Sequence, residues 1–319
     1  MKDFTLRGLL LIASCLVQAQ IVQFELPLSS NKVKDVAHQN NGLIWVATDE
    51  GLNVFYDNEK YVFYSDIQDS LSILNSKVDL LKVTSNDDLI ALSQDGISIF
   101  DSDNFNFKQL KLTSKPVSIV EELDSGDLWV ATENSGYYLI NSDFKIEGHY
   151  AFDPLNPLSI STSKLSGNNE KSIIFSDFKA FISTNNGFNI FNKKLKTFKR
   201  YFKGKKSKLS SNKIVGIEEF GNKILIASEN EIVVFDKESS KFENKVNTSF
   251  SINSLLSIPD GPIFLRTIDS DYEVSLNSNG LKINALKANS IPISNNMTRS
   301  NTSLLFWDKN SSNITQTDY

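Results

Sequence analysis

The sequence predicts an all-β fold, a seven-bladed β-propeller with six complete four-stranded blades and a seventh blade shared between N-terminal and C-terminal strands. Two observations carry this prediction. The 319 residues include 22 Phe and 9 Tyr against only 14 Gly and 7 Pro, a balance that favours strands over helices. A pattern of four short strands also returns every ~40 to 50 residues, which is the period of a propeller blade.

The clearest repeat unit spans residues 33 to 64. It opens with an apolar, alternating run, and each later run follows a turn rich in Asp, Asn, Glu or Gly, as expected of short strands joined by tight turns. The four predicted strands of this unit cover residues 33–37, 43–48, 52–55 and 61–64.

The turn between the second and third strands marks each repeat. Glycine suits this position because a short hairpin loop needs a positive φ, which glycine adopts without steric cost. Glu231 departs from the pattern, so we expect a blade there but not the same turn type. The equivalent turn positions are Gly51, Gly96, Gly136, Gly187, Glu231 and Asp271.

The two ends of the propeller are expected to share a blade. Residues 291–319 offer two or three strands rather than four, and residues 21–26 form a strand pattern that has no partner in the first blade. Pairing the two would close the ring and leave no open edge.

The N-terminus reads as a targeting segment. Residues 1–19 have a charged start, a short apolar stretch and small residues before a cut ahead of Gln20, which predicts a signal peptide and export to the periplasm. An alternative is a lipoprotein signal with lipidation at Cys15, the single cysteine of the chain. After cleavage before Gln20 the propeller, residues 20–319, holds no cysteine, which excludes disulfides and thiolate metal sites.

Several segments resemble the two-component regulator propeller repeat. Residues 42–53 read Gly-Leu-Ile-Trp-Val-Ala-Thr-Asp-Glu-Gly-Leu-Asn, close to the usual Gly-Leu-Trp-Ile-Gly-Thr segment followed by acidic or amide residues and Gly-Leu. Residues 185–191 are similar, and residues 153–159, Asp-Pro-Leu-Asn-Pro-Leu-Ser, resemble the connections between blades in that family. The resemblance is weak after Asn277.

This resemblance implies the periplasmic sensor region of a Bacteroidetes-type hybrid two-component histidine kinase. Such proteins continue into a second propeller, a β-sandwich, an inner-membrane helix and a kinase, so we expect this chain to be the first part of a longer protein that forms a homodimer. The resemblance also implies that the propeller binds an oligosaccharide or polysaccharide fragment and controls a downstream kinase. It implies no catalytic activity and no cofactor in this region.

The residues themselves offer little for catalysis. His38 and His149 lie near strand ends without a metal-ligand or phosphoacceptor context, and no P-loop or Gly-x-Gly-x-x-Gly is present. The carboxylate pairs 121–122 and 218–219 are expected to be surface charges beside turns, since neighbouring strand residues face opposite sides. Two alternatives stay open: a secreted propeller lyase acting on a glycan or a cyclic peptide, and a protein-docking scaffold.

Two further features have a structural and a functional interpretation. Trp45 and Trp129 share a register in their second strands, which predicts core packing rather than a sugar-stacking platform. Nine positive charges fall between residues 193 and 208. They form either an outer strand and a solvated loop or, at Lys199, Arg200 and Lys203, a binding strip for a polyanion; export argues against nucleic acid.

The ligand is expected on the face formed by the turns between second and third strands. These turns lie on the same face as the connections between blades, and their carboxylates and amides suit sugar hydroxyls, although hairpins favour the same residue types on their own account. The candidate residues are Asp49, Glu50, Asp95, Glu133, Asn134, Asn185, Asn186, Glu229 and Asn230.

Overall fold

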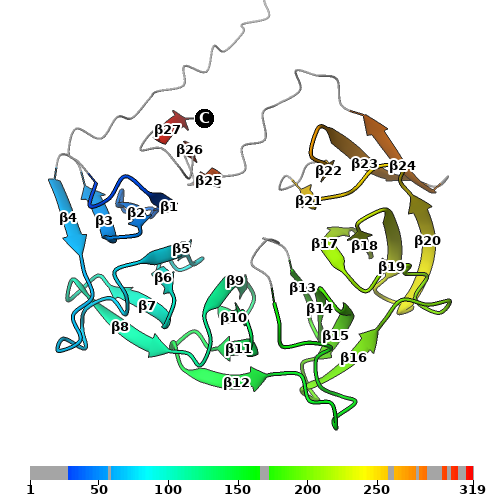
Figure 1. Ribbon diagram of the computed structural model, residues 1–319, viewed down its shortest axis with the longest axis horizontal. Helices are drawn as coiled ribbons and strands as arrows, with labels where there is room; N and C mark the ends of the chain where they lie inside the picture. Colours follow the sequence, from blue (N-terminus) through cyan, green and yellow to red (C-terminus); the bar gives the residue numbers. More distant parts are fainter. Residues whose placement is uncertain are drawn as a thin grey trace, which may run out of the picture.

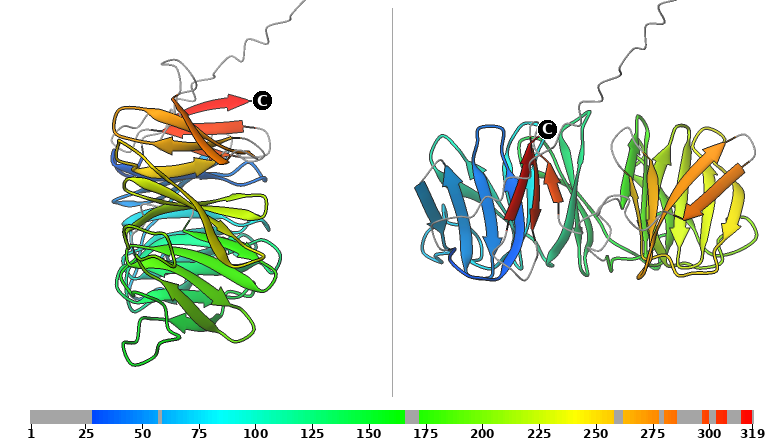
Figure 2. Two further views of the ribbon diagram at one scale, coloured as in Figure 1. Left: turned by 90° about the vertical axis from the view of Figure 1, so that its right-hand side faces the viewer. Right: turned by 90° about the horizontal axis from the view of Figure 1, so that it is seen from above.

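All regular structure in the described part of the chain is β-strand, which confirms the predicted all-β class. Six four-stranded antiparallel sheets, here called blades 1 to 6 in chain order, are accompanied by one three-stranded sheet. Figure 1 shows the blades arranged around a central axis, with the first strand of each blade innermost and the fourth at the rim, and Figure 2 shows the ring edge-on. The computed structural model describes residues 28–56, 59–165, 172–257, 262–277, 280–285, 297–299, 303–307 and 314–318.

Blades 1 to 3 follow one another without a crossover. Each has its strands in sequence order from the axis to the rim. Their strands are β1 (Val33–His38), β2 (Ile44–Thr48), β3 (Gly51–Tyr56), β4 (Glu59–Phe63), β5 (Val78–Val83), β6 (Leu89–Ser93), β7 (Gly96–Asp101), β8 (Asn106–Lys111), β9 (Pro116–Glu122), β10 (Asp127–Thr132), β11 (Gly136–Ile140) and β12 (Ile146–Tyr150).

Blades 4 to 6 repeat this order, and the three-stranded sheet follows them in the chain. Their strands are β13 (Ile173–Ser176), β14 (Lys179–Thr184), β15 (Gly187–Asn192), β16 (Thr197–Tyr201), β17 (Ile214–Phe220), β18 (Lys223–Ser228), β19 (Glu231–Asp236), β20 (Lys241–Asn247), β21 (Ser254–Ser257), β22 (Ile263–Arg266), β23 (Asp271–Asn277), β24 (Gly280–Ala285), β25 (Met297–Arg299), β26 (Ser303–Trp307) and β27 (Ile314–Asp318).

Each predicted turn position is the first residue of a third strand. Four of these residues are glycines with positive φ, for example +144° at Gly96 and +75° at Gly136. A Cβ atom on Gly96 would lie 2.2 Å from the Leu110 carbonyl oxygen of the fourth strand, and one on Gly136 would lie 2.2 Å from the Tyr150 carbonyl oxygen. Glycine is therefore required here by close backbone approach as well as by φ.

Glu231 replaces this glycine in blade 5 without a positive φ, and the blade expected there is present. The residue is 2% exposed. One carboxylate oxygen accepts a hydrogen bond from the Ser210 amide at 2.6 Å, and the other lies 2.5 Å from Lys245 Nζ. Glu231 therefore holds the connection that leads into its own blade.

The hydrophobic core consists of layers between blades rather than within them. Five buried clusters each join one blade to the next, for example Trp45 and Leu52 of blade 1 with Leu89 and Phe107 of blade 2. Trp45 is fully buried, and Trp129, at 1% exposure, has the same place between blades 3 and 4. The prediction of core packing for both tryptophans is confirmed.

Closure into seven blades stays a prediction. In addition to six complete blades there is a three-stranded sheet, and its strand β25 lies against β1 (Figure 1). The N-terminal strand expected to complete this sheet, together with the signal peptide and Cys15, lies outside the described residues. Within the described ranges, no helix is long and apolar enough to cross a bilayer.

We expect Gly96→Ala to lower the free energy of unfolding by about 3 kcal/mol or more, since strained φ and overlap with Leu110 add together. Gly204→Ala is the matched control, because Gly204 has a similar φ of +153° but no atom within 4 Å of the added Cβ. It should cost about 1 kcal/mol. Equal losses in urea unfolding of the two variants would contradict the steric argument.

The Glu231 contacts also predict a pH dependence. Burial raises the pKa of this carboxyl, but the Lys245 and Ser210 contacts outweigh it, and the net shift is downward. The stabilisation is therefore present above the unfolded-state pKa and is lost as pH falls through the lower, folded-state pKa. We expect Glu231→Gln to cost about 1 to 3 kcal/mol at pH 7, and the gap to wild type should narrow below pH ~4. Glu229→Gln, an exposed neighbour, should follow the wild-type curve at every pH.

Candidate functional site

The nine candidate ligand residues all lie in turns between second and third strands. Because every blade has the same antiparallel strand order, these turns share one face of the ring with the connections between blades. At three turns the first amide of the third strand donates to the following connection: from Gly51 to Ser76 O at 2.7 Å, from Gly136 to Ser163 O at 2.9 Å and from Gly187 to Asn212 O at 2.6 Å. The expected common face is therefore formed, although no bound ligand marks it as a site.

Threonine hydroxyls stiffen these turns. Thr48 Oγ1 donates to Gly51 O at 2.8 Å, and Thr184 Oγ1 donates to Gly187 O at 2.9 Å. The residues between them are thus held on short, braced loops, which is the kind of rigid support that a binding face needs.

Four of the nine side chains serve the scaffold. The Asp49 carboxylate accepts from Ser30 Oγ and lies 3.1 Å from Lys32 Nζ; the Ser30 hydroxyl, and then Lys32, lower the pKa of Asp49. Asn186 Nδ2 donates to Ser161 O at 3.0 Å in the connection between blades 3 and 4. The residues whose side chains are tied down in this way are Asp49, Asp95, Asn186 and Asn230.

The other five side chains are exposed, and none makes a side-chain hydrogen bond to another described residue. They combine carboxylate acceptors with amide groups that both donate and accept, so they can bind sugar hydroxyls by several weak hydrogen bonds on a shallow surface. These residues are Glu50, Glu133, Asn134, Asn185 and Glu229.

The basic run includes β16, the outermost strand of blade 4, as one interpretation predicted. Its arginine is committed to the scaffold: the Arg200 guanidinium donates to Asn156 O, Ser159 O and Ser159 Oγ. Lys193 pairs with Glu122 of blade 3. Lys199 and Lys203 are exposed, so these two carry the free charge of the predicted strip.

Sequence reasoning missed a second copy of the connecting loop that Arg200 holds. In residues 153–160 the Ser159 hydroxyl accepts from the Asp153 amide at 2.9 Å, and in residues 66–73 Ser72 does the same for Asp66 at 3.0 Å. The shared signal is an Asp, a second Asp or Asn, and then Leu-Ser-Ile. The repeated loop therefore connects blades 1 and 2 as well as blades 3 and 4.

The carboxylate pairs require a correction, because three of the four are buried rather than surface charges. Glu121, Glu122 and Glu218 are 7%, 8% and 2% exposed. Glu121 accepts both the amide and the hydroxyl of Ser85 in blade 2. Glu122 pairs with Lys193 of blade 4, so these two acids of β9 tie blade 3 to both of its neighbours.

The two histidines lie in different settings. His149 stacks on Tyr138, with 4.2 Å between ring centroids, and its Nε2 lies 2.7 Å from Ser135 O. His38 is half-buried on β1, where burial lowers its pKa against the opposing charge of Asp87. No cluster of three or more metal-ligating side chains occurs within the described ranges.

Comparison with known proteins shows the fold. No protein-family model and no curated protein matches the chain. Among solved structures, the extracellular domain of the hybrid two-component system BT3049 from B. thetaiotaomicron matches with a TM-score of 0.63 and 17% identity, over 94% of this chain and 42% of that one. The extracellular domain of the hybrid system BT4673 from the same organism matches with a TM-score of 0.60 and 11% identity, over 90% and 40%.

A propeller enzyme also matches. Virginiamycin B lyase from Staphylococcus aureus gives a TM-score of 0.57 and 14% identity, over 92% of this chain and 98% of the lyase. The chain thus spans about two fifths of the matched sensor domains and nearly the whole of the lyase. It shares its fold with extracellular domains of hybrid two-component systems, the class of protein that the sequence resembles, and with a lyase.

Proposed function

We propose that this chain is the extracytoplasmic ligand-sensing propeller of a two-component signalling protein. It binds an oligosaccharide or polysaccharide fragment on the face formed by the turns between second and third strands. Ligand binding controls a kinase outside this chain, through a homodimer of the full-length, membrane-anchored protein. Export to the periplasm places the propeller where such a ligand is met.

One observation carries this proposal. Five exposed carboxylates and amides occupy equivalent turns on a single face, without side-chain partners in the described part of the ring. Threonine hydroxyls brace three of these four turns. The spread of the five side chains over four blades suits an extended ligand that makes several weak contacts. The fold shared with extracellular sensor domains supports the same conclusion.

A second candidate is a secreted lyase, favoured by the likeness to a lyase over nearly its whole length. The chain has only two histidines, and His149 is stacked against Tyr138 at the rim. A lyase of this fold would therefore have to use His38 or a tyrosine as its base. A third candidate, a protein-docking scaffold, would bind a partner protein without responding to any glycan.

We expect a neutral oligosaccharide to raise the melting temperature of the purified chain. In a panel of neutral oligosaccharides, the one that gives the largest shift is then tested on a Glu133→Gln, Asn134→Ala, Asn185→Ala variant. Because these side chains support no described contact, the unliganded Tm should stay within about 1 °C of wild type, since surface changes are small. The ligand-induced shift should disappear.

Asn186→Ala is the matched control, because it lies in the same turn but binds Ser161. It should lower the unliganded Tm and keep the ligand shift. A shift that survives in the triple variant, or that is lost instead in Lys199→Gln, Lys203→Gln, would place the ligand elsewhere. Absence of a shift with every glycan would contradict the proposed function.

We expect no turnover of glycans or cyclic peptides. Incubation with a polysaccharide panel should yield no new reducing ends and no unsaturated products, and a cyclic depsipeptide should remain intact by mass spectrometry. Turnover that is abolished by His38→Ala would establish the lyase and overturn the sensor proposal.

A further inference from the structure

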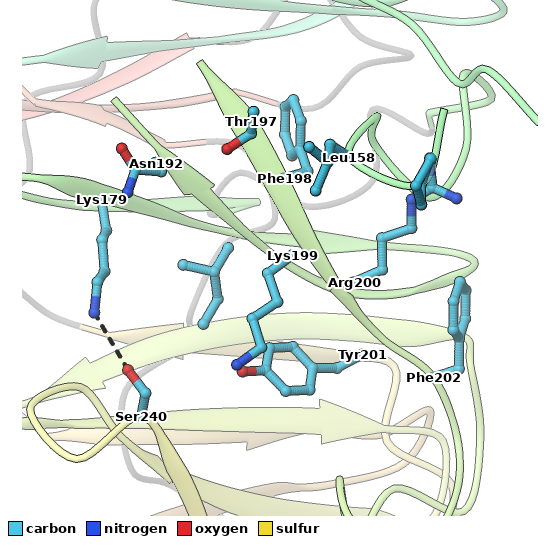
Figure 3. A pocket seen from close by; sticks show the side chains of 12 residues that line it. Leu158, Lys179, Asn192, Thr197, Phe198, Lys199, Arg200, Tyr201, Phe202 and Ser240 are labelled. Carbon is cyan, nitrogen blue, oxygen red and sulfur yellow. Dashed lines mark hydrogen bonds between the residues drawn. The ribbon is translucent and has the colours of Figure 1, made fainter. Parts of the chain in front are cut away.

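A groove of about 630 Å³ lies at the rim of blade 4 and runs along its outermost strand, β16. Figure 3 shows its wall, formed by β16, with Lys179 and Ser240 on one side and Leu158 on the other. Ser240 belongs to the turn between β19 and β20, so the groove also reaches blade 5. Its size falls in the range of small-ligand sites, about 300 to 1,000 Å³.

The groove is rich in donors and its lining holds no Asp or Glu. Lys179 Nζ donates to Ser240 Oγ at 3.2 Å, and neither Lys179 nor Lys199 forms a salt bridge within the part of the chain described. Lys199 Nζ lies over the ring of Tyr201, 5.1 Å from its centroid. The Tyr201 hydroxyl is buried and has no hydrogen-bond partner in the described structure, a costly state that an acceptor ligand would relieve.

Blade 2 carries the structural counterpart of this groove, with a volume of about 410 Å³. The strand registers identify the equivalent residues: Lys108 pairs with Ile99 as Lys199 pairs with Ile190. Gln109 donates to Ser72 O in the same loop position that Arg200 binds at Ser159. The repeat itself therefore produces a groove, and its chemistry can be compared between the two blades.

The two grooves differ in charge. Asp101 pairs with Asn106 in blade 2, and Asn192 pairs with Thr197 in blade 4. Asp101 and Asn192 are therefore equivalent positions. When the second strands are aligned on their last residues, Ser93 and Thr184, Asp88 corresponds to Lys179. The blade 4 groove thus has an amide where the blade 2 groove has Asp101. It also has Lys179 in its lining, whereas the equivalent Asp88 does not line the blade 2 groove.

The two grooves also differ in their aromatic side chains. Tyr201 and Phe202 occupy the places that Leu110 and Lys111 have in blade 2. Phe202 is 43% exposed. The blade 4 groove therefore presents cations beside rings that can pack against the apolar face of a sugar.

We propose that the blade 4 groove binds the carboxylate or sulfate group of an anionic oligosaccharide. Lys179 and Lys199 supply the charge, the Tyr201 hydroxyl donates to the anion, and Phe202 packs against the sugar ring. An extended peptide fits less well, because the Phe198 amide on this edge strand already donates to Leu158 O at 2.8 Å and blocks strand addition. This site lies along the rim strand of blade 4 and meets the turn face only at Phe202, beside Gly187. It goes beyond the neutral ligand tested on the turn face.

The test measures binding of three probes of equal length by calorimetry at low salt: an oligogalacturonate, a sulfated oligosaccharide and a neutral oligosaccharide. We expect at least one anionic probe to bind and to weaken as salt rises. The double variant Lys179→Gln, Lys199→Gln should raise the Kd of that probe at least tenfold, because charged hydrogen bonds are lost. Tyr201→Phe, which keeps the ring, should raise it about threefold to tenfold.

Lys108→Gln is the matched control, since it removes the same charge from the counterpart groove. It should leave the Kd unchanged. Equal weakening by Lys108→Gln would indicate non-specific charge and overturn the proposal, as would the failure of both anionic probes to bind. The anionic probe that binds more tightly shows whether the groove prefers the carboxylate of a uronate or the sulfate of a sulfated sugar. The neutral-ligand shift at the turn face should be the same in all these variants, so the two proposals fail separately.

Discussion

Five of the buried clusters in the described structure each join one blade to the next, and this packing between blades governs the rest of the structure. Trp45 and Ala47 of β2 pack against blade 2, while Val46 lies in a cluster on the other side of the same strand. A blade is therefore stable only between neighbours, as in other repeat proteins. Apolar residues on both faces of most middle strands are the result, and few polar side chains enter the blades.

Polar residues that do enter the blades hold the connections. Asn53 is fully buried in β3 and accepts from the Ser29 amide at 2.9 Å, and Asn189 in β15 accepts from the Ser161 amide at 3.0 Å. In both cases the strand ties down the segment that leads into its own blade. Because these internal side chains fix the connections, several turn side chains on the same face are left without side-chain partners in the described structure, and the two proposed sites use that face and the rim.

The sequence was sufficient for the blades because their signals are local. Every predicted turn position begins a third strand, including Glu231, since a hairpin is specified by residues next to each other. Contacts between blades have no such local signal. Glu121 was expected at the surface, and only the position of Ser85 in the neighbouring blade shows why it is buried. In the same way, the basic run in the sequence pointed to Lys199 but gave no sign of Lys179 or of the loop that Arg200 binds.

The repeat that makes the fold stable also frees its rim to diverge. Phe107 and Phe198 occupy equivalent positions and are buried. Their backbone amides donate to equivalent leucines of the two connecting loops, Leu71 and Leu158. The framework of the two grooves is thus fixed by packing. Lys179 and Asn192 stand where blade 2 has acids, and neither position contributes to an inter-blade cluster, so a change of charge there costs the ring little. A propeller can therefore acquire a site in one blade while its counterpart keeps only the scaffold role.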